Sequence, residues 1–181
     1  MHVVSVNVSA GTLIEWQGRR VLTGIFKRPV AGRVRVRRDG LAGDRQADLT
    51  VHGGELKAVY SYSVASYEWW NRELGQTLPP GMFGENLTID GLDDETVAIG
   101  DRFTIGTTVL EAVQPRLPCY KLGVRFGDMT MVKRFMQSRR YGTYFRVLIE
   151  GELGAGDEVR LVYHDPTSAP VVSLVNQRAE S

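Results

Sequence analysis

The sequence predicts a mainly β protein, a β-barrel decorated with a few α-helices. Three observations carry this prediction: the 181 residues divide into many short strand-like segments, turns separate those segments, and only two segments have helical periodicity. The 20 glycines are spread along the chain, and Gly-Asp pairs recur where a turn leads into a strand. Many short strands with few helices are typical of β-barrels.

The expected strands are runs of β-branched residues or of alternating apolar and polar residues. Residues 33–37, with the sequence RVRVR, alternate strictly, so their valines face one side and their arginines the other. The remaining expected strands are residues 3–8, 21–26, 58–62, 86–89, 101–105, 108–113, 143–150 and 158–163.

Two segments have apolar residues at helical spacing instead. The first is 63–74, where Ser63 is a suitable N-cap. The second is 128–140, which places Phe135 on an apolar face and is expected to stop before Gly142. These two segments are the helices expected to pack around the barrel.

The chain is expected to form one domain over residues 1–164, followed by a poorly tied C-terminal tail over 165–181. Lys plus Arg total 22 and Asp plus Glu total 21, so the net charge of +1 gives no general attraction to nucleic acid or membranes. The sequence has no signal-peptide pattern and no apolar run approaching the ~20 residues that cross a bilayer. We therefore expect a cytoplasmic protein that does not bind membranes.

Three blocks of sequence, together with GIFK at 24–27, carry a resemblance to a known family. The blocks are GDRQADLTVHGG at 43–54, GMFGENLT at 81–88 and QPRLPCYKL at 114–122. In this order and spacing they resemble the MOSC domain, the C-terminal module of molybdenum cofactor sulfurases, over nearly the whole chain. The resemblance implies a MOSC-type β-barrel that binds molybdopterin carrying molybdenum, with Cys119 as the metal ligand. Similar stand-alone bacterial proteins reduce N-hydroxylated compounds, including 6-hydroxylaminopurine.

Cys119 is the only cysteine, and its neighbours suit metal ligation. Arg116 and Lys121 lie within three residues of it, and cations stabilise the thiolate that binds soft metals. Pro115 and Pro118 stiffen the loop. A lone cysteine is otherwise a small buried apolar residue; the matched context favours ligation.

The His52-Gly53-Gly54 sequence is a candidate for cofactor binding and catalysis. Glycines permit close backbone approach, and their amides can bind a phosphate or a pterin oxygen. His52 is a candidate proton donor near neutral pH. On the residues alone, a plain Gly-Gly turn with His52 in the core is an equal alternative.

Four other residues complete the candidate site. Arg45 and Arg116 are expected to bind the cofactor phosphate, because the guanidinium group matches phosphate oxygens. Asn86 is expected to hydrogen-bond the cofactor, and Lys27 to supply positive charge or a proton. Lys57 is interpreted as a solvated surface cation.

The sequence therefore predicts a molybdenum-dependent reductase with a small N-hydroxylated substrate. No flavin or iron–sulfur motif is visible, so an external electron-donor reductase is the expected partner. Two alternatives remain. In the first, Cys119 carries a persulfide in sulfur transfer. In the second, the arginine-rich strand at 33–38 binds RNA, which the near-neutral charge disfavours.

Overall fold

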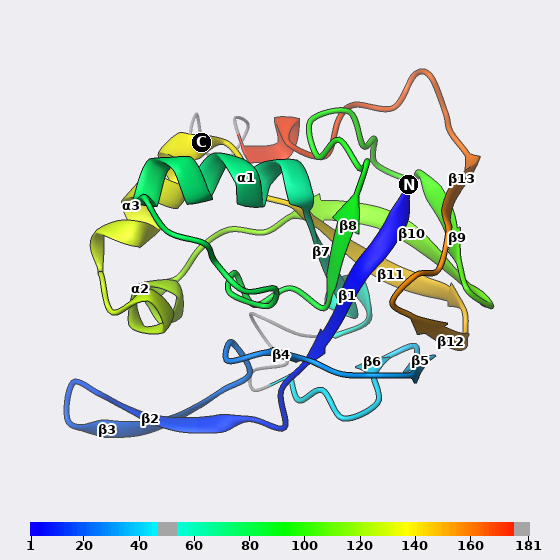
Figure 1. Ribbon diagram of the computed structural model, residues 1–181. Coiled ribbons are helices and arrows are strands. Elements are labelled where there is room, and N and C mark those ends of the chain that lie inside the picture. The colour runs from blue at the N-terminus through cyan, green and yellow to red at the C-terminus, as the bar shows by residue number, and fades with distance from the viewer. Residues whose placement is uncertain (47–53, 176–181) are drawn as a thin grey trace.

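The computed structural model describes residues 1–46 and 54–175, and its body is a large curled sheet (Figure 1). In the described residues this sheet has eight strands in the order β13-β9-β10-β11-β7-β8-β1-β4. All neighbouring pairs are antiparallel except β7 and β8, which are parallel. The strand bounds are β1 His2–Val8, β4 Arg28–Pro29, β7 Val59–Ser63, β8 Leu87–Asp90, β9 Arg102–Ile105, β10 Thr108–Pro115, β11 Thr143–Ile149 and β13 Val159–Tyr163.

Two smaller sheets flank the large one. One has three strands, β5 (Arg33–Arg37), β6 (Gly40–Leu41) and β12 (Gly151–Gly154). The other is a hairpin of β2 (Thr12–Trp16) and β3 (Arg19–Thr23), which extends away from the body (Figure 1). The strict alternation predicted for 33–37 is confirmed, because both valines of β5 are buried and its arginines are exposed. Each other predicted strand overlaps an observed one.

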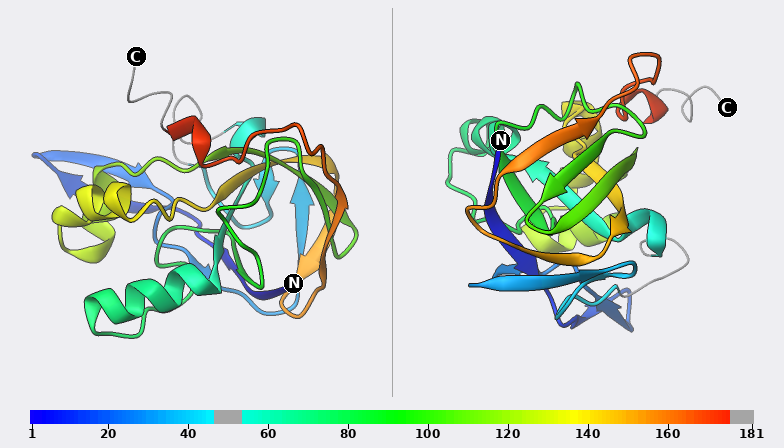
Figure 2. Two further views of the ribbon diagram at one scale, coloured as in Figure 1. Left: turned by 90° about the horizontal axis from the view of Figure 1, so that it is seen from above. Right: turned by 90° about the vertical axis from the view of Figure 1, so that its right-hand side faces the viewer.

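The prediction of a mainly β fold is confirmed, but the prediction of a closed barrel is wrong for the described residues. The sheet curls so that β1 and the start of β13 come close (Figure 2). There the His2–Glu158 bridge forms, and the Val3 amide donates to the Asp157 carbonyl at 2.9 Å. β4 and β13 are the two ends of the strand order and do not pair with each other, and β4 ends at Pro29, which has no N–H to donate.

The helix α1 (Val64–Leu74) forms as predicted. The Ser63 hydroxyl accepts a hydrogen bond from the Ser66 amide at 3.2 Å, so Ser63 is the N-cap. Tyr67 and Trp70 on its inner face are buried in an aromatic cluster. No helix within residues 1–46 and 54–175 is long and apolar enough to cross a membrane.

The second predicted helix is shorter than expected, and a third was not predicted. Helix α3 spans Thr130–Ser138 and ends at Arg139, which has a positive φ of 58°. Gly142 therefore does not end the helix; a Cβ there would lie 2.3 Å from the Ser61 carbonyl, so glycine lets the start of β11 approach β7. Helix α2 (Tyr120–Phe126) has two turns and an internal glycine, so it is too short to show a helical period in the sequence. A short 3-10 helix, η1, covers Glu55–Lys57.

From residue 165 to residue 175, the chain is attached to the body of the protein. The Val171 amide donates to the Val97 carbonyl at 2.8 Å, and the Ile99 amide donates to the Ala169 carbonyl at 3.0 Å. Val171 and Val175 are buried. The expectation of a poorly tied tail is therefore wrong for 165–175, and 176–181 lie outside the described residues.

Asp94 is a buried carboxyl group at the start of α1. Its Oδ2 accepts hydrogen bonds from the Ser63 amide and the Ser66 hydroxyl, both at 3.3 Å. Its Oδ1 has no partner among the described residues. Burial raises the pKa of Asp94 from 3.8 to about 6. The folded state thus binds the Asp94 proton more tightly than the unfolded state does. The protonated carboxyl group therefore contributes its full stabilisation below about pH 4, and this stabilisation is lost as the pH rises through 6.

We expect Asp94→Asn to remove this pH dependence. Relative to the wild type, the variant should gain up to about 3 kcal/mol in the free energy of unfolding as the pH rises from 4 to 7. Urea unfolding at several pH values measures the difference. Glu73→Gln, at an exposed carboxyl group of α1, is the control and should keep the wild-type pH dependence. Parallel profiles for Asp94→Asn and the wild type would contradict this assignment.

Candidate functional site

A cavity lies where the hairpin, the large sheet and the loop before α2 meet. Its empty volume, which includes the solvent-open space at its mouth, is about 620 Å³. The wall comes from six separate stretches of sequence and is rich in cationic and aromatic side chains. It is lined by Thr23, Gly24, Ile25, Lys27, Asp44, Arg45, Gln46, Lys57, Tyr60, Gly84, Asn86, Arg116, Cys119, Lys121 and Tyr144.

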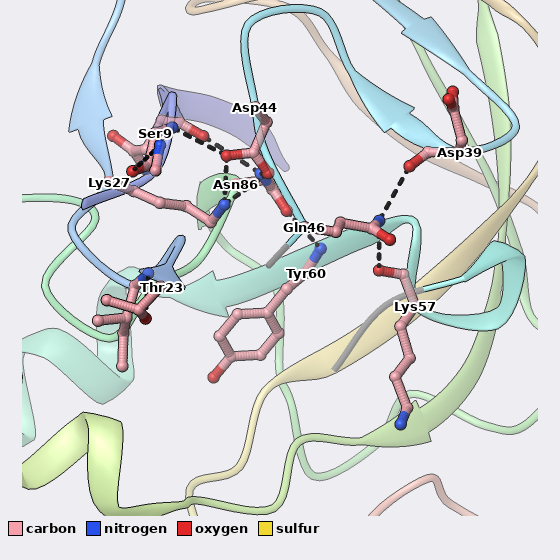
Figure 3. A network of polar contacts seen from close by, with 12 residues as sticks. Ser9, Thr23, Lys27, Asp39, Asp44, Gln46, Lys57, Tyr60 and Asn86 are labelled. Carbon is pink, nitrogen blue, oxygen red and sulfur yellow. Dashed lines mark hydrogen bonds and ion pairs between the residues drawn. The ribbon is translucent and has the colours of Figure 1, made fainter. Parts of the chain in front are cut away.

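A buried ion pair between Lys27 and Asp44 forms one side of this wall (Figure 3). The Lys27 Nζ lies 2.5 Å from both Asp44 carboxylate oxygens, and the two side chains are only 9% and 6% exposed. Burial lowers the pKa of Lys27, an effect that the adjacent Asp44 carboxylate opposes. Lys27 is thus an ammonium group that releases its proton more readily than an exposed lysine does.

Asp44 is held by more than the ion pair. Its Oδ1 accepts a hydrogen bond from the Ser9 amide at 2.8 Å, and its Oδ2 accepts one from the Asn86 side chain at 2.9 Å. Asn86 is buried, and its Oδ1 accepts from the Tyr60 amide at 3.1 Å. These contacts link the ends of β1, β7 and β8 to the ion pair (Figure 3).

A glycine allows the two chain segments that carry the ion pair to meet. A Cβ at Gly24 would lie 2.3 Å from the Arg45 carbonyl oxygen, closer than any side chain permits. The Arg45 amide also donates to the Ser9 carbonyl at 2.7 Å. The GIFK and GDRQ stretches are therefore held in direct backbone contact, which brings Lys27 to Asp44.

Cys119 lies on another side of the cavity, directly before α2. Its side chain is half-buried, makes no capping hydrogen bond and belongs to the cavity wall. Arg116 is buried beside it, donates to the Phe83 carbonyl and places its guanidinium carbon 5.1 Å from the centre of the Tyr60 ring. The thiol therefore faces a polar cavity rather than the apolar core.

The structure brings together most of the residues expected at the site. Cys119, Lys27, Arg45, Asn86 and Arg116 all line the cavity. The amide of Asn86 and one guanidinium nitrogen of Arg116 are already bonded within the protein, so these two residues support the wall as well as lining it.

Three predicted site residues remain. His52 and Gly53 lie outside the described residues. Gly54 is not among the lining residues, and its amide donates to the Gln46 side chain at 2.8 Å. That contact connects the end of the first sequence block to the wall without exposing the Gly54 amide to the cavity.

Sequence reasoning missed several lining residues, of which Asp44 and Lys57 matter most. Asp44 is not among the site residues expected from the sequence, yet it pairs with Lys27 in the wall. Lys57 was interpreted as a surface cation, yet it belongs to the wall and its carbonyl accepts from Gln46 at 3.4 Å (Figure 3). The position of Asp44 within the first block and of Lys57 three residues after it was the available indication.

The fold and the cavity define a mainly β protein with a polar cavity whose wall contains one thiol and several cations. The sequence model of the MOSC domain matches residues 48–160. The chain therefore belongs to the MOSC domain family.

Known relatives include bacterial and fungal proteins. The chain is 42% identical over 160 residues to the uncharacterized protein YflK of Bacillus subtilis, a match that covers 88% of this chain and 72% of YflK. The crystal structure of YiiM from Geobacillus stearothermophilus superposes with a TM-score of 0.78 at 32% identity, over 96% of this chain and 80% of that one. A protein of Gibberella moniliformis named "Reductase" is 35% identical over 153 residues, 80% of this chain but only 26% of the fungal protein.

We expect Asp44→Asn to destabilise the fold by about 3 kcal/mol or more, because it leaves Lys27 buried without its counter-charge. Chemical denaturation measures the loss. The control is Glu158→Gln, which removes an exposed ion pair with Arg160 and should cost less than about 1 kcal/mol. The double variant Lys27→Met/Asp44→Asn should recover part of the stability. Equal costs for Asp44→Asn and Glu158→Gln would show that the buried pair does not hold the site.

Proposed function

We propose that this protein is a molybdenum-cofactor-dependent reductase of N-hydroxylated compounds, with Cys119 as the protein ligand of the metal. The observation that carries the proposal is the Cys119 thiol in the wall of a cationic cavity in a MOSC-family fold. The fungal relative named "Reductase" supports the redox class.

The lining residues fit the chemistry of this cofactor. A thiolate is a suitable ligand for molybdenum, a soft metal in this setting, and Arg45, Lys57 and Lys121 offer positive charge to a phosphate. No group of three His, Cys, Asp or Glu side chains suited to a metal occurs among the described residues. Cys119 would therefore hold a metal whose other ligands arrive with the cofactor.

When bound, the cofactor supplies two-electron redox chemistry next to the thiol. Reduction of an N–OH group to N–H takes two electrons and two protons and releases water. Lys27 is the described residue best placed to give a proton to the departing oxygen, since it lines the cavity and burial lowers its pKa. Asp44 orients the ammonium group through both carboxylate oxygens. The electrons come from an external reductase, and His52 stays a predicted second proton source.

Metal and pterin analysis tests the cofactor assignment. Protein made in a host that synthesises the cofactor should contain about one molybdenum per chain, and Cys119→Ser should lower this at least about tenfold. Arg45→Ala should lower the pterin content, whereas Arg35→Ala, on the exposed face of β5, is the matched control and should not. Metal-free wild-type protein from that host contradicts the proposal. An intact mass that instead shows one added sulfur atom would favour a persulfide at Cys119.

Replacing the proposed proton donor should slow turnover more than it weakens substrate binding. We expect the double variant Lys27→Met/Asp44→Asn, which leaves no buried charge unpaired, to lower kcat about 100-fold with little change in KM. In the wild type, kcat should fall as the pH rises through the lowered pKa of Lys27, and the variant should lose this alkaline decline. Lys133→Met, at an exposed position of α3, is the control and should behave as the wild type. An unchanged pH profile in this double variant would assign the proton to another group.

A further inference from the structure

The β2–β3 hairpin is a ribbon attached to the body at its base and at its tip. It forms a two-stranded sheet of its own, and most of its residues are exposed, including Leu13 at 55%. An isolated two-stranded hairpin has little stability without further contacts. At its base, Thr23 and Gly24 belong to the cavity wall. The base of the hairpin therefore borders the cavity.

The tip of the hairpin is shaped to present Trp16. Gln17 and Gly18 form a two-residue turn with positive φ angles of 50° and 73°, the geometry of a type I′ turn. Trp16 and Arg19 are paired across it. This turn makes Trp16 the last paired residue of β2. To form it, Gln17 adopts a left-handed backbone conformation that is uncommon for a residue other than glycine.

Trp16 stacks on Tyr120, the residue that directly follows Cys119. The ring centres are 4.6 Å apart and the planes differ by 22°. Both rings are only partly buried, and neither belongs to the two hydrophobic clusters of the described residues. The other stacked or tilted aromatic pairs in the described part of the chain are built from members of those clusters. This pair is therefore a surface contact beside the site and not part of the core.

The ring pair lies next to the cavity wall: Tyr120 stands between the lining residues Cys119 and Lys121, although neither ring lines the cavity itself. The hairpin leaves the wall at Gly24 and extends away from the body (Figure 1), and Trp16 near its tip contacts Tyr120, one residue from the lining thiol. Partly exposed rings next to a site offer faces on which a planar heteroaromatic molecule stacks, whatever its exact substituents.

We propose that Trp16 and Tyr120 form an aromatic platform that selects planar heteroaromatic substrates. This inference rests on the proposed function for the reaction itself, but it assigns recognition to residues outside the catalytic set. The rings of the platform bind the flat face of a purine-like substrate, and the N–O group reaches toward the Cys119 side of the cavity. Substrates without a planar ring do not stack on the platform, so it does not strengthen their binding.

The test compares two N-hydroxylated substrates of the cofactor-loaded protein, with reduced methyl viologen as the electron donor. For 6-hydroxylaminopurine, Trp16→Ala should raise KM about tenfold and change kcat less than about twofold. For hydroxyurea, which has no aromatic ring, KM should stay within about twofold. Trp16→Phe should restore most of the loss, and Leu13→Ala, on the same strand, is the matched control. Equal increases in KM for both substrates would overturn the platform.

A binding measurement separates this inference from the proposed function. Adenine binding by equilibrium dialysis requires no turnover, and Trp16→Ala should weaken it about tenfold while Leu13→Ala leaves it unchanged. If neither substrate is reduced but adenine binding depends on Trp16, the reductase proposal fails and the platform stands. Adenine binding that is unaffected by Trp16→Ala overturns the platform even in an active reductase.

Discussion

The site depends on one constraint, the need to satisfy a charged pair that is almost fully removed from water. Lys27 and Asp44 come from different connections of the fold, and a buried charge is tolerated only when its partner and its hydrogen bonds are in place. Asp44 meets this requirement through Lys27, Ser9 and Asn86. Folding the three strands that carry or adjoin these groups therefore also assembles one wall of the cavity.

The opposite wall is fixed by a second kind of interaction. Arg116 is buried between the Tyr60 and Phe135 rings and the Phe83 carbonyl, so its charge is stabilised by π faces and by a backbone oxygen. Three residues later the chain reaches Cys119, and α2 begins directly after it. The anchored arginine thus limits the movement of the loop that carries the thiol. Tyr60 connects the two walls, since its amide bonds to Asn86 while its ring lies under Arg116.

Sequence analysis predicted the features that depend on neighbouring residues. It missed those that depend on contacts between residues far apart in the sequence. Alternation identified β5 because five residues are enough for a period of two, whereas β4 and β6 have two residues each and no period. Closure of a barrel depends on the register and length of edge strands, which composition does not express. The blocks located Lys27 and Cys119, but the partner of Lys27 is 17 residues away and Asn86 is 42 residues from Asp44. Nothing in the spacing of these residues indicates which pairs will meet.

The cavity wall is assembled from stretches that are distant in sequence, and this has a practical consequence. A molecule that touches several of these stretches acts as a non-covalent cross-link, because it binds only when all of them are in their folded positions. By mass action such a ligand raises the midpoint of thermal unfolding in proportion to the logarithm of its concentration above Kd. Collections of heterocycles and anions can therefore be ranked by melting temperature alone, before any reaction has been demonstrated.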